Sequence, residues 1–211
     1  IFSVLIFYMT QFVASSPLEC SFDLLVDSEK SLDYNDPKST TPVPETMTYT
    51  CLIEPATNQT IKASDLSNVV IASHDSDHNH EDVNGFSMMN LPIVQFPVGD
   101  IQNFTNLTTL SIFNCSLSSI TQSNIKIYTK LKVLMLTHNA IHVIEPELFR
   151  YNQELQMIHL ERNQIFHIDP MVFDGIQDTI SVLSLMENNC TFTSDNATIV
   201  NFKLKIYFLI P

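Results

Sequence analysis

The sequence predicts an α/β solenoid in which short parallel strands line a concave face and irregular, 3-10 or helical turns form the convex side. One pattern of apolar residues occurs three times between Leu107 and Ile176, each time displaced by 24 residues. Each copy joins a short alternating segment, typical of a strand, to a longer irregular one that returns the chain. No single copy buries its own apolar face, so stacked copies must share one core.

The pattern is that of a leucine-rich repeat. The first copy reads Leu107-x-x-Leu110-x-Ile112-x-x-Cys115-x-Leu117-x-x-Ile120. The second reads Leu131-x-x-Leu134-x-Leu136-x-x-Asn139-x-Ile141-x-x-Ile144. The third reads Leu155-x-x-Ile158-x-Leu160-x-x-Asn163-x-Ile165-x-x-Ile168. A period of 24 residues with the form L-x-x-L-x-L-x-x-N/C-x-L is the signature of this repeat.

The repeat extends in both directions, so residues 83–190 are expected to hold about five strands. Stepping back 24 residues keeps every core position of residues 83–106 apolar, with Leu91 in the asparagine position. Going forward, Ile180-x-x-Leu183-x-Leu185-x-x-Asn188 is displaced by one residue. We expect the extra residue, Asp178 or Thr179, to lie in the preceding loop.

A polar position recurs where each predicted strand turns away from the sheet. An amide can satisfy the backbone groups that such a turn leaves unpaired inside the stack. A cysteine takes this place in the first clear repeat, and we interpret it as a buried structural thiol. The predicted structural ladder consists of Cys115, Asn139, Asn163 and Asn188.

The strand positions between the leucines are predicted to face out of the concave sheet, in columns across the repeats. Several of these positions are apolar although the core does not require it. Exposed apolar patches often mark interaction sites. The predicted partner-binding residues are Phe113, Val133, Met135, Thr137, Met157, His159, Glu161 and Met186. Two alternatives are ordinary surface apolarity and cover by a C-terminal segment such as residues 199–210. Five strands give a face only about 20–25 Å long, which favours a weak binder, a dimer or a chain with further repeats.

The charge is acidic and uneven. The formal net charge is −13, and residues 17–100 hold 14 Asp/Glu against 3 Lys/Arg, a net of −11. Nucleic acid binding needs Lys and Arg to neutralise phosphate, so nucleic acid is not expected as a partner. An anionic membrane surface is disfavoured for the same reason, and we expect membrane attachment only if the chain is a receptor fragment.

The N-terminal region is predicted to be a signal followed by a cap. Residues 1–15 resemble the apolar region and cleavage site of a secretory signal peptide that lacks its start, since no Met begins the sequence. Residues 16–82 are expected to form a cap region with a mobile loop at 33–45 and a β-hairpin built on strands at 47–53 and 68–73. In an oxidising compartment Cys20 and Cys51 are expected to pair.

The C-terminal region leaves one cysteine over. We expect residues 191–211 to be a truncated C-terminal cap, and Cys190 to pair with another chain or with a cysteine beyond Pro211. A secreted chain can be glycosylated at N-x-S/T sequons, and the sequence has six of them. The predicted glycosylation sites are Asn58, Asn103, Asn106 and Asn196. Asn114 precedes a core position, and we expect it to stay unmodified.

One segment is a candidate for metal chemistry. His74, His78 and His80 lie among four acids in residues 74–82 and could bind a divalent cation, although a solvated acidic loop explains the same composition. Catalytic motifs are lacking: the sequence has no phosphate loop, nucleophile elbow, H-E-x-x-H or C-x-x-C. We therefore expect no enzyme activity, no catalytic residues, no cofactor and no bound metal.

These residues resemble the secreted leucine-rich repeat proteins of dipteran insects. The similarity rests on Tyr49-Thr50-Cys51 in the cap, Asp82-Val83 at the first repeat and Asn188-Asn189-Cys190 at the last, and it covers residues 20–200. That group usually has a cysteine-closed C-terminal cap, and here no second cysteine follows Cys190. Related mosquito proteins act in innate immunity as disulfide-linked complexes, so the resemblance implies such a role.

The sequence therefore predicts a secreted, extracellular and glycosylated protein that binds another protein, or a second leucine-rich repeat chain, through its concave face. A role in innate immunity or extracellular signalling follows from the resemblance. The alternative is a truncated ectodomain of a membrane leucine-rich repeat receptor. The identity of the partner does not follow, because concave residues are set by the partner and not by the fold.

Overall fold

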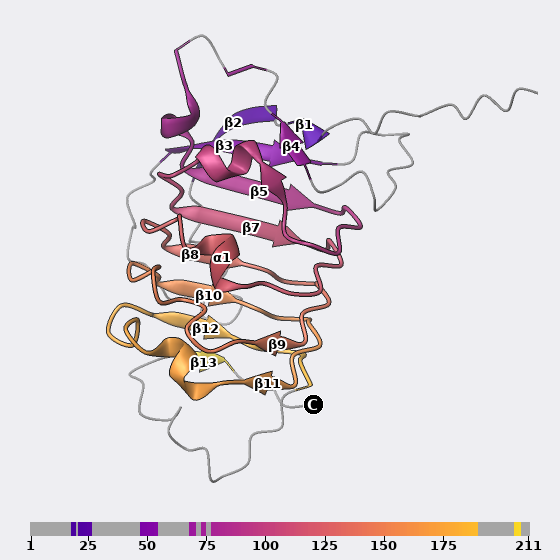
Figure 1. The fold of residues 1–211 in the computed structure, drawn as a ribbon, viewed down its shortest axis with the longest axis vertical. Helices are drawn as coiled ribbons and strands as arrows, with labels where there is room; N and C mark the ends of the chain where they lie inside the picture. The colour runs from indigo at the N-terminus through magenta and orange to yellow at the C-terminus, as the bar shows by residue number, and fades with distance from the viewer. Residues whose placement is uncertain are drawn as a thin grey trace, which may run out of the picture.

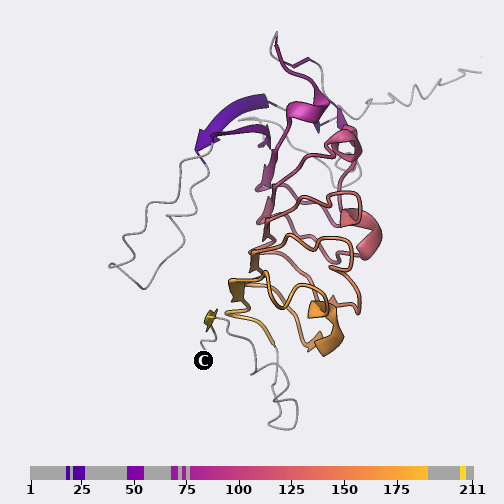
Figure 2. The same ribbon diagram turned by 90° about the vertical axis from the view of Figure 1, so that its left-hand side faces the viewer.

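The structure of the chain is a computed structural model. It describes residues 18–19, 21–26, 47–54, 68–70, 73–74, 77–189 and 205–207. Within these residues the chain winds as a solenoid, with strands stacked one above another along its length (Figure 1). Seen from the side, the strands form one wall and the turns form the other (Figure 2). The predicted leucine-rich repeat solenoid is confirmed.

The concave wall is an eight-stranded sheet in the order β13-β12-β10-β8-β7-β5-β3-β2. Only β2 and β3 pair antiparallel; the other neighbours are parallel. Its strands are β2 (Ser21–Val26), β3 (Met47–Ile53), β5 (Gly85–Met89), β7 (Thr109–Phe113), β8 (Val133–Met135), β10 (Met157–His159), β12 (Val182–Ser184) and β13 (Lys205–Tyr207). At about 4.8 Å per spacing the sheet is roughly 34 Å long, which is longer than the five repeat strands alone.

The convex wall is built from short and irregular elements, as predicted. They are η3 (His80–Asp82), β6 (Val98–Gly99), η4 (Asp100–Asn103), α1 (Gln122–Ile125), β9 (Val143–Ile144), β11 (His167–Ile168) and η5 (Pro170–Phe173). Strands β9 and β11 pair in parallel as a second small sheet. Among the residues described, no helix is both long and apolar enough to cross a bilayer.

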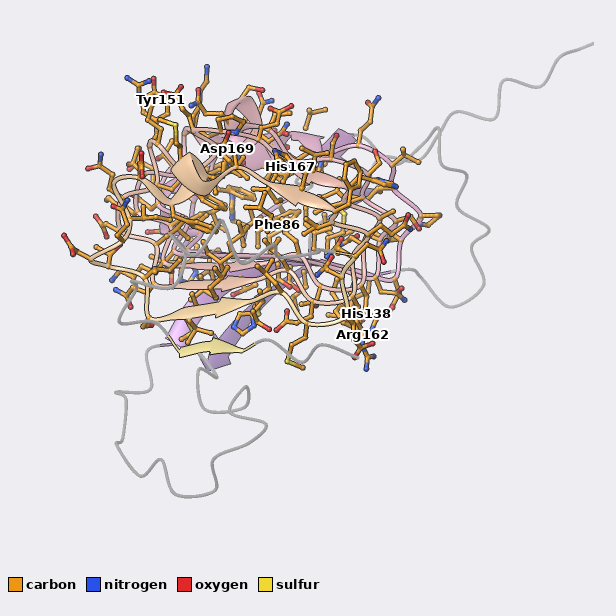
Figure 3. The ribbon with its side chains drawn as sticks, turned by 90° about the horizontal axis from the view of Figure 1, so that it is seen from below. Phe86, His138, Tyr151, Arg162, His167 and Asp169 are labelled. Carbon is orange, nitrogen blue, oxygen red and sulfur yellow. The ribbon has the colours of Figure 1, made fainter. Side chains whose placement is uncertain are left out.

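The core lies between the two walls and follows the 24-residue pattern. The apolar positions of the pattern from Val83 to Ile176 are at most 7% exposed, apart from Ile168, which is partly buried. Phe86 sits at its centre, between the sheet and the turns (Figure 3). Burying this continuous surface is what drives the repeats to stack.

The cap differs from the prediction. The antiparallel hairpin pairs β3 with β2, not with the strand at 68–73. Strand β4 (Asn68–Val70) instead joins a three-stranded sheet between β1 (Leu18–Glu19) and β6. Since β3 already pairs in parallel with β5, only its outer edge is free for a hairpin, and the preceding segment takes it. Residues 21–26 therefore form a strand of the cap.

The displaced fifth repeat is seen in the register. Met157 pairs with Val182, a separation of 25 residues, whereas Met157 pairs with Val133 at 24. The extra residue falls between Ile176 and Ile180, where the Ile180 N–H donates to the Ile176 carbonyl at 3.0 Å. Asp178 and Thr179 both lie in this loop, as expected.

Several predictions concern residues outside those described. These are the signal at 1–15, the loop at 33–45, Cys20, Cys190, Asn58, Asn196 and the C-terminal cap except for β13. Cys51 is fully buried and disulfide-bonded. Its predicted partner Cys20 is outside the described residues, so that pairing stays a prediction.

Candidate functional site

The strand register brings the predicted concave residues into columns. Across β5, β7, β8, β10 and β12 each strand residue faces its equivalent in the next repeat. Because side chains alternate along a strand, the residues that flank the core positions share the outer surface of the sheet. The first column is Gly85, Thr109, Val133, Met157 and Val182; the second is Ser87, Ser111, Met135, His159 and Ser184.

Exposure corrects part of the predicted binding patch. Phe113 is 37% exposed, and Met135, Thr137, Met157, Glu161 and Met186 are partly exposed. Val133 and His159, however, are only 5% and 6% exposed, so both are buried. Parallel strands are about 4.8 Å apart, so the neighbours on each side cover a side chain in the middle of a column. The predicted continuous apolar patch is therefore interrupted.

Most exposed large apolar side chains lie on the turns and not on the concave sheet. Phe166 is 59% exposed and Met171 is 63% exposed. The others on the turns are Val94, Val98, Val143 and Tyr151. Phe113 is the exception on the sheet, at the end of β7. The apolar surface of the concave face is thus made mainly by partly exposed methionines.

A histidine–glutamate pair lies on the concave face at the end of β10. The Nδ1 atom of His159 lies 2.9 Å from Oε1 of Glu161. Burial by itself raises the pKa of Glu161, but the hydrogen bond and charge of His159, together with the nearby Ser184 hydroxyl, hold that pKa below its ordinary value. The carboxyl is therefore kept ionised inside a largely covered position.

This pair orients an imidazole as in hydrolases but does not complete a catalytic set. Nucleophilic catalysis needs a hydroxyl or thiol hydrogen-bonded to the far ring nitrogen. Among the residues described, Nε2 of His159 has no hydrogen-bond partner. Ser184 pairs with His159 on the neighbouring strand, and its hydroxyl acts on Glu161. Within the described residues, the pair therefore lacks the bonded nucleophile that acyl transfer needs.

A polar rim follows the carboxyl ends of the strands. The residues after each strand share a left-handed backbone and are Asn90, Asn114, His138, Arg162 and Glu187. Arg162 donates from Nε to Glu187 at 2.9 Å and lies 2.8 Å from Nε2 of His138 through Nη1. The ring of His138 packs against Phe113 at 4.9 Å between centroids. His138 and Arg162 lie together at one edge, away from His167 and Asp169 (Figure 3).

The asparagine ladder holds the strand ends in place. Oδ1 of Asn139 accepts from the Cys115 and Leu117 amides at 3.1 and 3.0 Å, and its Nδ2 donates to the Ile112 carbonyl at 2.7 Å. Asn163 bonds to the Ile141 amide and the Leu136 carbonyl in the same way.

Both ends of the ladder follow the same plan. Asn188 accepts from the Ile165 amide and donates to the Leu160 carbonyl. At the other end, the thiol of Cys115 is free, fully buried and 3.7 Å from the Met88 carbonyl. Burial raises the pKa of this thiol to about 11. A reactive cysteine needs a stabilised thiolate, so this environment favours a structural role.

A second polar column on the convex side was missed by the sequence reasoning. Asn152 is fully buried and donates from Nδ2 to the Ile125 and Tyr128 carbonyls at 2.9 and 2.8 Å. Tyr128 is also fully buried, and its hydroxyl donates to the Ile101 carbonyl at 3.1 Å. The signal was present, because Phe104, Tyr128, Asn152 and Ile176 recur every 24 residues.

The histidines of residues 74–80 pack on the cap. The ring of His78 stacks on Tyr49 at 4.1 Å, and Nε2 of His74 lies 3.0 Å from Nδ1 of His80. In the part of the chain that the structure describes, no three His, Cys, Asp or Glu side chains are arranged to hold a metal ion. Here the histidines join the loop to β3 instead of facing a common centre.

Two predicted glycosylation sites can be placed. Asn103 is exposed. Asn106 is partly buried and bonded on both sides, donating to the Glu81 carbonyl at 2.8 Å and accepting from Lys130 at 2.7 Å. Asn114 is exposed, so its position beside the core does not bury it as the sequence reasoning assumed.

The match to one family model agrees with this fold. Residues 105–165 match the family model for the leucine rich repeat. No curated protein matches the chain. Among solved structures, an internalin (inlF) of Listeria monocytogenes is 21% identical with a TM-score of 0.43, covering 70% of this chain and 36% of that one.

Two further solved structures are similar. TLR13 in its complex with ssRNA13 is 17% identical with a TM-score of 0.49, covering 69% of this chain and 25% of that one. Internalin C2 of L. monocytogenes is 15% identical with a TM-score of 0.42, covering 68% and 72%. The chain thus spans well under half of the inlF and TLR13 chains.

Proposed function

We propose that this chain is a secreted leucine-rich repeat protein that binds another protein through its concave face. The observation that carries the proposal is the column arrangement of that face. It offers three partly exposed methionines, Met135, Met157 and Met186, around the hydrogen-bonded pair of His159 and Glu161 and beside the exposed ring of Phe113. Methionine adapts its shape to varied partners, and aromatic side chains often anchor interfaces.

The chemistry of the face favours binding over catalysis. In its histidine–glutamate pair, no nucleophile among the described residues is hydrogen-bonded to Nε2 of His159. The net charge of the chain, −13, favours a protein partner over nucleic acid, because nucleic acid binding needs basic residues to neutralise phosphate. The RNA in the TLR13 structure is a property of that protein.

Photocrosslinking tests the face. We would replace Met157 by p-benzoylphenylalanine in the full chain and, as a matched control, Met171, which is 63% exposed on the turns. Each variant is irradiated in body fluid or conditioned medium from the source organism. We expect a discrete covalent adduct from position 157 that is absent from position 171. Adducts from 171 alone, or equally from both, would place the interaction elsewhere.

Secretion and covalent assembly form a second part of the proposal. The apolar residues 1–15, the six sequons and the disulfide at Cys51 support an extracellular chain. By its resemblance to the insect proteins, the chain acts in innate immunity, and Cys190 joins it to a second leucine-rich repeat chain.

Expression in insect cells tests this part. We expect the protein in the medium, with a mass that falls on enzymatic deglycosylation. On gels, a dimer that collapses to monomer on reduction, and that Cys190→Ser abolishes, supports the intermolecular bridge. A monomer in both lanes leaves the receptor ectodomain as the better alternative, and a membrane-spanning run in the full transcript would establish it.

A further inference from the structure

The concave face has polar atoms that its own fold leaves without partners. Nε2 of His159 and Oε2 of Glu161 are both buried and have no partner within hydrogen-bonding geometry among the described residues, although the Ser184 hydroxyl lies close enough to Glu161 to lower its pKa. They belong to two outward-facing residues of one strand and its end, two positions apart, so they lie on the same surface. A buried polar group without a partner costs free energy, so such a pair invites a group that would satisfy it.

Oε2 of Glu161 and Nε2 of His159 can both accept a hydrogen bond. The carboxylate Oε2 of Glu161 accepts hydrogen bonds and cannot donate. When the ring of His159 is neutral and its Nδ1–H donates to Glu161, Nε2 is also an acceptor. Two adjacent acceptors match a group that only donates, and in proteins these are the ammonium of lysine and the guanidinium of arginine.

The five repeat strands do not supply this cation themselves; beyond them, Lys205 of β13 pairs with Val182. Arg162, next in sequence, gives Nε to Glu187 and Nη1 to His138 on the rim. Among the outward columns of the five repeat strands, Glu161 is the only acidic residue and no lysine or arginine occurs. Within the five repeat strands, the negative charge of Glu161 therefore remains for a partner.

The surroundings fit a long side chain with a charged tip. Met135 pairs with His159 across the sheet, Met157 precedes it on β10, and Met186 lies beside Glu161, where the Arg162 amide donates to its carbonyl. Methionine side chains pack well against the methylene stem of a lysine or arginine. The rim adds a donor: Arg162 only donates, so Nε2 of His138 accepts and its buried, unpaired Nδ1 carries hydrogen.

We propose that the concave face recognises a basic side chain of its protein partner, whose charged tip bonds to Glu161 and His159 while its stem lies among Met135, Met157 and Met186. The neighbouring Nδ1–H of His138 donates a hydrogen bond to a backbone carbonyl of the same partner segment. This rests on the proposed function and names its partner chemistry. The overall charge of −13 makes a basic partner complementary at longer range as well.

Methionine-methyl NMR tests this with defined probes. The full chain is labelled with 13C-methyl methionine and titrated with Ac-Gly-Ser-Gly-Lys-Gly-Ser-Gly-NH2, its arginine analogue and its acetyl-lysine analogue. We expect the lysine or arginine peptide to shift Met135, Met157 and Met186 but not Met171, and the acetyl-lysine peptide to shift none. This comparison uses the wild-type chain alone and does not depend on whether any variant folds.

Two variants with equal charge separate a local from a general effect. Glu161→Gln should weaken binding of the basic peptide by about tenfold or more, as expected when a covered charge pair loses one member. Glu154→Gln removes the same charge from an exposed turn position and should leave binding unchanged. Equal shifts with acetyl-lysine, equal losses in both variants or no concave shift would overturn the inference. If crosslinking at position 157 still captures a partner, only this inference fails and the proposed function stands.

Discussion

At the scale of single residues, the concave rim depends on an unfavourable backbone. Asn90, Asn114, His138, Arg162 and Glu187 all have φ between 51 and 58°. This left-handed region is sparsely populated by residues other than glycine. This conformation turns the chain so that the next residue enters the core. In three repeats that residue is Asn139, Asn163 or Asn188, which forms hydrogen bonds to backbone groups there. The stack therefore holds each position in a conformation that the residue alone disfavours.

The ionised carboxyl of Glu161 gives a residue-scale prediction about pH. Its pKa is lower in the folded chain than in the unfolded one, so the unfolded chain takes up a proton first as the pH falls. The pair with His159 therefore stabilises the fold above the ordinary glutamate pKa of about 4.3, and this contribution disappears as the pH falls through the lower folded value. Urea unfolding of wild type and Glu161→Gln should converge over that range.

The control for this pH dependence is Glu154→Gln, which removes an exposed carboxyl. It should differ from wild type by a nearly constant amount across the same pH range. If the gap between Glu161→Gln and wild type instead widened on acidification, the assigned direction of the Glu161 pKa would be wrong.

At the scale of elements, the ladder gives a prediction about the strand ends. Asn139→Ala leaves the buried amides of Cys115 and Leu117 without an acceptor. Each orphaned group carries a desolvation cost, so we expect a loss of about 2–4 kcal/mol in the free energy of unfolding. Urea titration measures it, with the exposed Gln153→Ala as control, expected within about 0.5 kcal/mol of wild type. If Asn139→Ala lowered the free energy of unfolding no more than the control does, the ladder would not stabilise the strand ends.

The contact between cap and first repeat gives a second prediction at this scale. A Cβ at Gly85 would overlap Oγ1 of the buried Thr50 and lie 3.0 Å from its Cβ and Cγ2. Overpacking of this kind costs about 1–3 kcal/mol, so Gly85→Ala should lower stability by that amount.

A double mutant identifies the cause. Truncating Thr50 to Ala removes Oγ1 and Cγ2, so Gly85→Ala should cost clearly less in the Thr50→Ala background. An equal cost in both backgrounds would assign the effect to the strand backbone and not to the cap contact. Thermal unfolding of the four proteins completes the cycle.

At the scale of the whole molecule, the eight strands form one sheet from cap to β13. From β3 to β12 each strand is buried on one side by the common core, so cap, repeats and ladder support one another. The acidic charge belongs to this scale too, because repulsion from phosphate is a sum over the molecule.

That charge predicts no binding to RNA. In a filter assay at about 0.15 M salt, labelled single-stranded RNA should not be retained at protein concentrations that saturate the protein partner, because release of counterions requires a basic surface. A basic RNA-binding domain serves as the positive control. Retention that weakens as salt rises would mean that local basic groups outweigh the net charge.

The repeats were predictable in detail because every core position is repeated in the sequence. Leu110, Leu134 and Ile158 recur at 24 residues and are all fully buried. The hairpin between β2 and β3 was not predictable, since a segment such as residues 21–26 shows no repeat and acquires its partner only at the free edge of the sheet. The polar role of Asn152 was visible as periodicity but not as chemistry.

The sequence by itself determined the solenoid, its period, the columns of the concave face and the asparagine ladder. These follow from side-chain spacing, which the covalent chain already contains. Only the tertiary structure decided which outward residues stay exposed. Val133 and His159 are covered while Phe113 is open, because exposure depends on neighbours 24 residues away and on their size. The same packing places Glu161 against His159 and leaves one buried polar atom of each without a partner, an arrangement that no spacing in the sequence reveals.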